Sequence, residues 1–394
     1  MFGLSKMAAR AAVLATAALV AACAPQVNTS GGGKPTNAIP PGGFDPNVPV
    51  KIAVLAPSSA SNAGAAALGK ALVNSARMAA VDLNDPLIEL AIYDTGGDAG
   101  TAAAAAGRAV ADGAKLIVGP LFGANTKAIA STAAASNLKV LSFSTDSSAA
   151  GGPVFLTGFL PEKAATRVMN FAKLQGYSAL GIFYPQTDYG QVALRGAQTA
   201  LGPNLVVATP YERTEQGIPP ASAEVAAKIK ATGTRALLIA ESGQALGFVA
   251  GQLGNSGIRP GKYRFLGLGE WNSRSTLTSK QLGGSWFPAP DQNAMQSFVQ
   301  KYRGNFGNVP PQLAVLGYDA VQMAGQMLQE ARATGSKDPF GFAAVTRPQG
   351  FQGAVGPIRF DSNGLGERGM AILEVGTGSF KTIDPAPVTF GAGS

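Results

Sequence analysis

Residues 50–57 read VKIAVLAP and form a short run that is apolar except for Lys51 and ends at a proline. A run of this length is typical of a buried strand that is covered by helices on both faces. Runs of the same kind follow at LIELAIYD (87–94), KLIVG (115–119) and KVLSFS (139–144). Helical stretches separate them at 64–83, 101–112 and 125–136. This alternation with short loops predicts an α/β fold with a doubly wound parallel sheet.

The same alternation starts again after residue 158. Pro161 opens a predicted helix that carries Ala164, Val168, Phe171 and Leu174 on one face. Strands are then predicted at ALGIFY (179–184), LVVATP (205–210), ALLIAE (236–241) and RFLGLG (264–269). The predicted helices between and after them lie at 189–201, 222–231, 246–253 and 312–332. Near the end, strand-like runs at AVGPIRF (354–360) and AILEV (371–375) flank the turn DSNG.

Chain length supports two domains. The 394 residues exceed the roughly 250–300 residues that one hydrophobic core usually serves. We therefore expect two doubly wound lobes with a cleft between them, joined by crossovers near residues 159, 284 and 349. The predicted N-terminal lobe comprises residues 50–158 plus 284–348, and the predicted C-terminal lobe comprises 159–283 plus 349–390. No close sequence repeat relates the two halves, so the expected similarity is one of architecture.

The N-terminus carries a predicted export signal over residues 1–22. Lys6 and Arg10 precede an apolar stretch that is too short to cross a bilayer. The string LVAAC, which ends at Cys23, resembles the lipobox of bacterial lipoproteins, and that resemblance implies acylation of Cys23. An ordinary cleavage signal beside an incidental cysteine is the alternative. Residues 23–49, rich in Gly, Pro, Asn and Ser, are predicted to form a flexible tether.

Composition excludes several kinds of chemistry. The sequence has no histidine and only one cysteine, which excludes Ser-His-Asp and Cys-His catalysis, His- or Cys-ligated zinc and an internal disulfide. The formal net charge of +8 is scattered along the chain, so we expect a solvated basic surface and no nucleic-acid partner. GAAALGKA (64–71) has P-loop spacing but ends in alanine where a Ser or Thr hydroxyl is needed. We interpret it as a helix start and expect neither a cofactor nor a metal.

Acidic residues follow several predicted strands, where α/β proteins bind ligands. They are Asp94, Asp146, Asp188, Glu241 and Glu270. Capping of a helix or turn is the alternative role for each acid, and we favour it for Asp94 and Asp188.

Glu270 stands beside Trp271, and a carboxylate next to an indole suits recognition of an ammonium or another polar ligand. The acids also leave open an enzymatic alternative. A glycosidase would need two carboxyl groups about 5–9.5 Å apart.

Hydroxyl groups follow two other predicted strands. Ser58 and Ser59 come after the first strand, and Ser142, Ser144 and Thr145 end the fourth. Such hydroxyls, together with free backbone amides at helix N-termini, form a natural anion site. Capping of the helices is compatible with that role.

The order of motifs resembles that of the type I periplasmic binding proteins of the Leu/Ile/Val-binding class. The motifs are KIAVLAPSS, LIVGPLFG, VLSFSTD, FYPQTDYGQ, GLGEW, GYDAVQMA and FQGAVGPIRFDSNG, and the match runs from Val50 to about Asp384. Within that class, GPLFG, FSTD, TGFLPE, DYGQ and LGEW look most like the lipoproteins called penicillin-binding protein activators.

The resemblance implies roles for single residues. The position of the hydroxyl that holds a ligand carboxylate in amino-acid binders is Gly123 here, with Phe122 before it. A family threonine corresponds to Thr145 or Asp146, the family tyrosine to Tyr189 and the ammonium-binding acid to Glu270. Gly123 has no hydroxyl, so one charge-assisted hydrogen bond to the ligand carboxylate is missing. Such a loss costs roughly 1.5–3 kcal/mol, and the resemblance therefore implies weakened binding of a carboxylate by the first lobe. With the strand-end residues above, the predicted ligand-binding set is Ser58, Ser59, Phe122, Gly123, Ser144, Thr145, Tyr189, Glu241, Glu270 and Trp271.

The resemblance implies binding without turnover. The main hypothesis is a lipid-anchored, periplasm-facing regulator of peptidoglycan synthesis, like the activators, that contacts a peptidoglycan synthase. The alternative is the substrate-binding lipoprotein of an ABC importer for amino acids or related compounds, with a permease as partner. In either case the expected ligand is a small polar molecule, an amino acid or a cell-wall fragment. Ala24 after the lipidated cysteine favours the outer membrane if the source is Gram-negative.

Overall fold

The fold is described from a computed structural model, which covers residues 44–391. The predicted signal peptide 1–22, Cys23 and tether residues 24–43 lie outside the described residues. The prediction that the tether extends to residue 49 is wrong at Phe44, which is 7% exposed because it packs into a hydrophobic core with Val50. Within the described part, no helix is both long enough and apolar enough to cross a membrane.

The first sheet is parallel throughout and has the strand order β2-β1-β3-β4-β5. Its strands are β1 (Val50–Ala56), β2 (Ile88–Asp94), β3 (Leu116–Val118), β4 (Lys139–Ser142) and β5 (Val154–Leu156). This is one of the two common orders of doubly wound folds, and it confirms the sheet that the apolar runs predicted.

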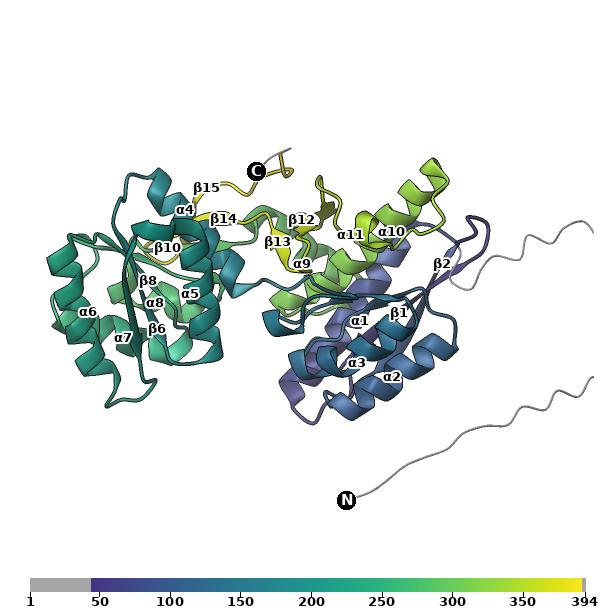
Figure 1. The fold of residues 1–394 in the computed structure, drawn as a ribbon, viewed down its shortest axis with the longest axis horizontal. Coiled ribbons are helices and arrows are strands. Elements are labelled where there is room, and N and C mark those ends of the chain that lie inside the picture. The colour runs from purple at the N-terminus through teal and green to yellow at the C-terminus, as the bar shows by residue number, and fades with distance from the viewer. Residues whose placement is uncertain (1–43, 392–394) are drawn as a thin grey trace, which may run out of the picture. The chain divides into compact units, whose positions relative to one another are not determined.

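Helices cover both faces of this sheet, as Figure 1 shows. Helices α1 (Ala63–Leu83) and α10 (Val315–Thr334) pack on one face, and α2 (Ala99–Ala111) and α3 (Gly123–Ala135) on the other. Successive residues of β1 alternate between the two cores, with Val54 facing α1 and α10 and Leu55 facing α2 and α3. Both side chains are fully buried, and each such burial contributes roughly 1.5–3 kcal/mol.

The second sheet repeats the first and then adds two strands. Its order is β7-β6-β8-β9-β10-β14-β15, in which the strands from β7 to β10 are parallel and β14 and β15 are antiparallel additions. The strands are β6 (Leu180–Pro185), β7 (Leu205–Tyr211), β8 (Ala236–Ile239), β9 (Arg264–Leu266), β10 (Trp286–Ala289), β14 (Ala371–Val375) and β15 (Phe380–Asp384).

Two helices pack on each face of the second sheet. Helices α4 (Pro161–Leu174) and α5 (Asp188–Leu201) share one core, and α6 (Ile218–Thr232) and α7 (Gly243–Asn255) share the other. The prediction for α4 is right for Ala164, Val168 and Phe171, which are buried, but wrong for Leu174. That side chain is 81% exposed because it is the last residue of the helix and lies beyond the packed surface.

The remaining elements connect or flank the two sheets. The longer ones are α9 (Gln292–Phe306), α8 (Arg274–Thr278), α11 (Phe342–Val345) and an antiparallel sheet of β11 (Phe351–Gly353), β12 (Gly356–Phe360) and β13 (Gly366–Arg368). The short 3₁₀ helices are η1 (Ser147–Ala149), η2 (Gly202–Asn204), η3 (Gly269–Trp271), η4 (Lys280–Leu282) and η5 (Gln312–Ala314).

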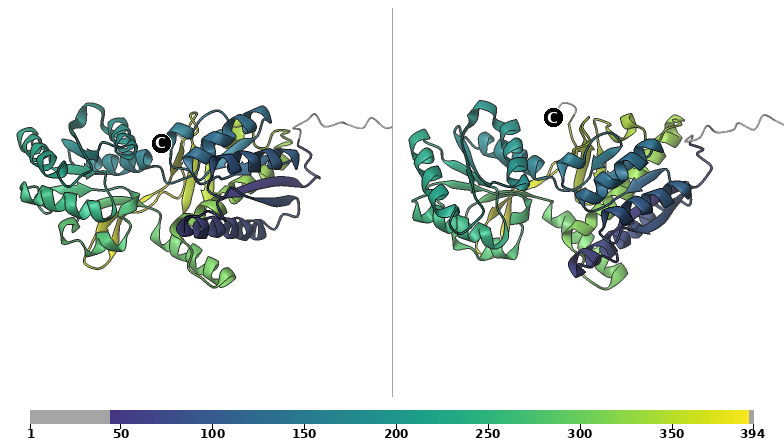
Figure 2. Two further views of the ribbon diagram at one scale, coloured as in Figure 1. Left: turned by 90° about the horizontal axis from the view of Figure 1, so that it is seen from below. Right: turned by 60° about the horizontal axis from the view of Figure 1, so that its bottom comes forward.

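Two of the predicted crossovers fall elsewhere in the structure. Strand β10 pairs with β9 and β14, so residues 286–289 belong to the second sheet and not to the first lobe. Phe351, Ile358 and Phe360 pack into the core of the first lobe beside α1 and α10. The chain therefore leaves the second sheet after Ala289 and returns to it after Arg368. Both views in Figure 2 show the C-terminal segment, coloured yellow-green to yellow, joining elements of each lobe in turn.

Candidate functional site

Each sheet has a point where the connections leave in opposite directions. In the first sheet, β1 leads to α1 on one face and the neighbouring β3 leads to α3 on the other. In the second sheet, β6 leads to α5 and the neighbouring β8 leads to α7 on the opposite face. Such switch points leave a crevice outside the carboxyl ends of the strands, where α/β proteins bind ligands. The predicted site residues lie in or beside the loops at these strand ends.

Ser59 and Asp94 form a turn at the first switch point. Asp94 Oδ1 accepts hydrogen bonds from the backbone amides of Ser59 (3.3 Å) and Gly96 (2.9 Å). Burial works to raise the pKa of Asp94, but hydrogen bonds from the Ser59 hydroxyl and from backbone amides outweigh it and hold the pKa below its usual value. Asp94 therefore has the turn-forming role that we favoured for it. The side chain of Ser59 is exposed and that of Ser58 is half-buried.

Gly123 and Asp146 are in close contact across the second loop of this switch point. A β-carbon added at Gly123 would lie 2.5 Å from Oδ2 and 2.6 Å from Cβ of Asp146, so a side chain there would collide with Asp146. The same Oδ2 forms an ion pair of 2.8 Å with Lys127 Nζ, one turn further along α3. Of the two residues that the sequence could not separate, Asp146 is the one against Gly123.

Asp146 also organises its own loop. It is the N-cap of η1, where its Oδ1 accepts a hydrogen bond of 3.0 Å from the backbone amide of Ser148. Burial works to raise the pKa of Asp146, but hydrogen bonds from Lys127 and Ser148 outweigh it and lower the pKa below its usual value. The carboxylate is thus held in its charged form.

The serines at the end of β4 are occupied within the loops. The buried Ser142 Oγ donates to Pro120 O (3.1 Å), lies 2.8 Å from Thr126 Oγ1 and accepts from the Ser144 amide. Ser144 Oγ accepts from the Asp146 amide at 3.0 Å, and this side chain is only 2% exposed. The predicted ligand contact of Ser144 does not fit this burial, because its hydroxyl is enclosed by its own loop. Thr145 is exposed, and Phe122 is half-buried.

Tyr189 and Glu270 form the polar pair of the second lobe. Tyr189 lies in the first turn of α5, after the N-cap Thr187, and its hydroxyl donates to Glu270 Oε2 at 2.8 Å. Burial raises the pKa of Tyr189 strongly, and the charge of Glu270 adds to the effect. Glu270 is accessible to solvent, yet the protein around it removes enough water to raise its pKa, against hydrogen bonds from its own amide and from Tyr189. Hydroxyl and carboxylate together suit a ligand that donates hydrogen bonds.

Glu241 lies at the end of β8 and is almost fully buried, at 3% exposure. Its oxygens accept hydrogen bonds from the Tyr211 hydroxyl (3.0 Å), from Arg213 Nε (2.9 Å) and Nη2 (3.0 Å), and from the Ser242 amide (2.9 Å). Burial and the charge of Glu241 raise the pKa of Tyr211. These contacts satisfy the carboxylate from within the protein, so Glu241 holds the loops and does not present a free acid.

Trp271 is a core residue and not an open ring. It is fully buried among the second-lobe side chains, and its Nε1 donates to the carbonyl oxygen of Glu241 at 2.8 Å. The expectation that its indole faces a ligand is therefore wrong, because η3 turns the ring inward while Glu270 turns outward. Asp188 is exposed in the first turn of α5, as expected of an acid at a helix start.

Sequence reasoning missed Tyr211 and Arg213. They lie at and just beyond the end of β7, and Tyr211 is paired in register with Pro185 of β6, at the switch point. The strand order could have identified them, because β7 lies next to β6 and its carboxyl end is therefore beside the switch point between β6 and β8. Among residues 44–391, no group of three or more His, Cys, Asp or Glu side chains is placed to hold a metal ion.

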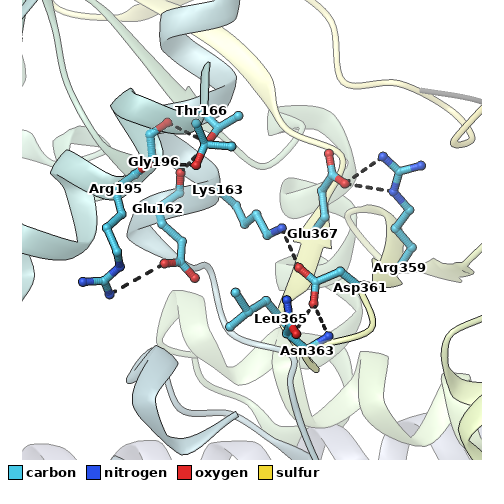
Figure 3. Close-up of polar contacts among 11 residues, drawn as sticks. Glu162, Lys163, Thr166, Arg195, Gly196, Arg359, Asp361, Asn363, Leu365 and Glu367 are labelled. Carbon is cyan, nitrogen blue, oxygen red and sulfur yellow. Dashed lines mark hydrogen bonds and ion pairs between the residues drawn. The ribbon is translucent and has the colours of Figure 1, made fainter. Parts of the chain in front are cut away.

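A separate charged cluster lies where the chain enters α4 (Figure 3). Lys163 Nζ pairs with Asp361 Oδ2 at 3.1 Å, and Arg359 pairs with Glu367 at 2.8 Å. A cavity of about 290 Å³ is lined by Lys163, Pro348, Arg359, Phe360, Asp361, Glu367 and Gly391. Its lysine and arginine are each paired with an acid, and none of the predicted site residues lines it.

Glu162 and Gly196 join α4 to α5 in the same region (Figure 3). A β-carbon on Gly196 would lie 2.2 Å from the carbonyl oxygen of Glu162, so glycine is needed for the two helices to approach this closely. Thr166 Oγ1 lies 2.9 Å from Glu162 O and 3.0 Å from Gly196 O, and it links the two backbones. Burial raises the pKa of the Glu162 carboxyl, and the charge of Arg195, 3.9 Å away, partly opposes this.

Comparison with known protein families finds a match to one family model. The family model described as periplasmic binding protein matches residues 49–379 of the chain. No curated protein matched the sequence.

Solved structures share the fold at low sequence identity. A protein described as a branched-chain amino acid ABC transporter from Rhodospirillum rubrum superimposes with a TM-score of 0.70 at 17% identity, covering 85% of this chain and 100% of that one. A leucine binding protein from Thermotoga maritima gives 0.57 at 21% identity, with 87% and 99% covered. A solute binding protein of an ABC transporter from Rhodopseudomonas palustris, in complex with 3,4-dihydroxybenzoic acid, gives 0.58 at 17% identity, with 87% and 97% covered.

Proposed function

Because this chain belongs to the periplasmic binding protein family, we propose that it is the substrate-binding protein of an ABC importer and binds a small polar ligand without turnover. Its two α/β lobes are those of the type I periplasmic binding proteins. The observation that carries the proposal is the repeated strand order, which gives each lobe a switch point with polar groups at its strand ends. The proposed cleft lies between these two sets of groups.

The proposed direct contacts are the accessible residues of the predicted set. In the first lobe they are Ser58, Ser59, Phe122, Gly123 and Thr145, and in the second lobe Tyr189 and Glu270. We assign positioning roles to the buried members, which are Ser144, Glu241 and Trp271. The Tyr189–Glu270 pair, 2.8 Å apart, would accept hydrogen bonds from an ammonium group of the ligand.

The importer is favoured over the activator of peptidoglycan synthesis. The solved structures above are described as proteins of ABC transporters or as a leucine binding protein. The likeness to penicillin-binding protein activators rests on short motifs of the sequence alone. An activator would act by contact with a synthase and would not need the Tyr189–Glu270 pair.

The test is isothermal titration calorimetry with amino acids, amino-acid amides, amines and peptidoglycan fragments. We expect one ligand group to bind, and Glu270→Ala to weaken that binding by 10- to 100-fold, since a charge-assisted hydrogen bond contributes about 1.5–3 kcal/mol. Glu224→Ala is the matched control, because Glu224 pairs only with Lys228 on the surface of α6. Silence across the panel, together with capture of a purified peptidoglycan synthase, would instead support the activator.

We also propose a periplasm-facing location through a lipid on Cys23, which lies outside the described residues. Metabolic labelling with a palmitate analogue should mark the wild-type chain and not Cys23→Ser. Membrane fractionation then separates the two functions. An inner-membrane location would support the importer, because its binding protein requires access to an inner-membrane permease. An outer-membrane location, which Ala24 favours in a Gram-negative source, would support the activator.

A further inference from the structure

We infer that Asp146 sets the charge class of the ligand, so that the first lobe receives an uncharged or cationic hydrogen-bond donor and rejects a carboxylate. This inference rests on the proposed function, since it concerns the same site. It names primary amines and amino-acid amides, and not free amino acids, as the substrate class.

The position of Asp146 gives the first argument. The N-terminus of α3 at Gly123 would attract an anionic ligand group, because the helix dipole and the free amides point outward there. In this chain the Asp146 carboxylate lies against that very residue, within 2.5 Å of where a β-carbon of Gly123 would stand. A second carboxylate would have to approach a like charge, and like-charge contacts in a binding site are strongly unfavourable.

The surrounding cations give the second argument, because each is already beside an acid. Lys127 pairs with Asp146 at 2.8 Å, and Arg213 pairs with Glu241 at 2.9 Å. Arg195 of α5 lies 3.9 Å from Glu162, and its Nη2 donates to the Ser147 hydroxyl, next to Asp146, at 3.2 Å. None of these cations is left to balance the carboxylate of a ligand.

The second lobe gives the third argument. Within the described residues, no ion pair neutralises Glu270, whose Oε2 accepts from the Tyr189 hydroxyl. Apart from these paired cations, the accessible polar side chains at the two switch points are therefore acids and hydroxyls. A ligand with an ammonium group and an amide or hydroxyl in place of the carboxylate complements both halves.

The test uses matched ligands that differ only at the carboxyl group, titrated into the full folded protein. One series is leucine, leucinamide and 3-methylbutylamine, and the other is phenylalanine, phenylalaninamide and phenethylamine. We expect the amide or amine of a series to bind at least tenfold more tightly than the acid. Asp146→Asn should bring the ratio of amide to acid affinity close to one, because it removes the repelling charge and frees Lys127.

Two further variants keep the outcome interpretable. Asp291→Asn changes another capping aspartate, which accepts from the Ala294 amide at the start of α9, and should leave the affinity ratio unchanged. Asp146→Ser removes the charge but keeps a residue that caps η1, in case Asp146→Asn does not fold. Preferred binding of the free acids by the wild type, or an unchanged ratio in a folded Asp146 variant, overturns this inference alone. Silence of both series and of every other probe overturns the proposed function, and this inference with it.

Discussion

The two lobes share one strand order, but their switch points use acids in opposite ways. In the first lobe, Asp146 stays partly exposed against Gly123 and keeps its charge through Lys127. In the second lobe, the acid at the strand end is Glu241, which is buried and fully bonded, while Glu270 is the accessible acid. The shared topology thus fixes where a site lies, and the side chains around each loop decide whether an acid supports the fold or remains available.

Glu241→Ala should give the largest change, because it removes the acceptor that holds the second switch point together. The Tyr211 hydroxyl and the Ser242 amide lose their partner, so we expect the free energy of unfolding to fall by about 3 kcal/mol. Urea unfolding followed by circular dichroism measures this. Thr145→Ala, on the exposed loop of the first lobe, should cost less than about 0.5 kcal/mol. Equal losses of unfolding free energy in the two variants would contradict the structural role of Glu241 in the second lobe.

Gly123→Ser tests the close contact in the first lobe. The added side chain collides with Asp146, so we expect a loss of about 2 kcal/mol in the free energy of unfolding. In an Asp146→Ala background the same change should cost at least about 1 kcal/mol less, because the collision is gone. Gly107→Ser on α2 is the control, since a β-carbon there meets nothing within 4 Å. Strict additivity of the two changes would contradict the contact.

The smallest expected effect is a difference between the lobes in how the stability contributed by their acids depends on pH. The pKa of Asp146 is lowered, so its contribution to stability is present above the unfolded pKa of aspartate and is lost as the pH falls through the folded pKa. The pKa of Glu270 is raised, so its contribution is present below the unfolded pKa of glutamate and is lost as the pH rises through the folded pKa.

Urea unfolding between pH 3 and pH 7 should therefore show opposite trends for two variants. The stability advantage of the wild type over Asp146→Asn should grow with pH, and stay under about 1 kcal/mol because solvent screens this partly exposed pair. The stability of the wild type relative to Glu270→Gln should decline over the same range. Parallel trends would mean that the two carboxyl groups have similar surroundings.

The position of the candidate site could be predicted from the sequence more reliably than the surroundings of each residue in it. Acids and hydroxyls that follow apolar runs had to lie at the carboxyl edge of a parallel sheet, and Ser59, Tyr189 and Glu270 are found there. Trp271 was misjudged because neighbours in sequence need not share an environment. The 3₁₀ turn η3 sends its ring into the core and leaves Glu270 accessible.

The sequence by itself determined most of the strands and helices and their alternation, because apolar period, proline and glycine act within a few residues. It did not predict β5, β10 or β15. Tertiary structure alone decided which sheet β10 joins, since its apolar run would suit either sheet and only pairing with β9 and β14 selects one. It also decided that Asp146 rests on Gly123. That contact depends on how β3 and β4 are placed side by side, and local sequence carries no record of which loops such pairing brings together.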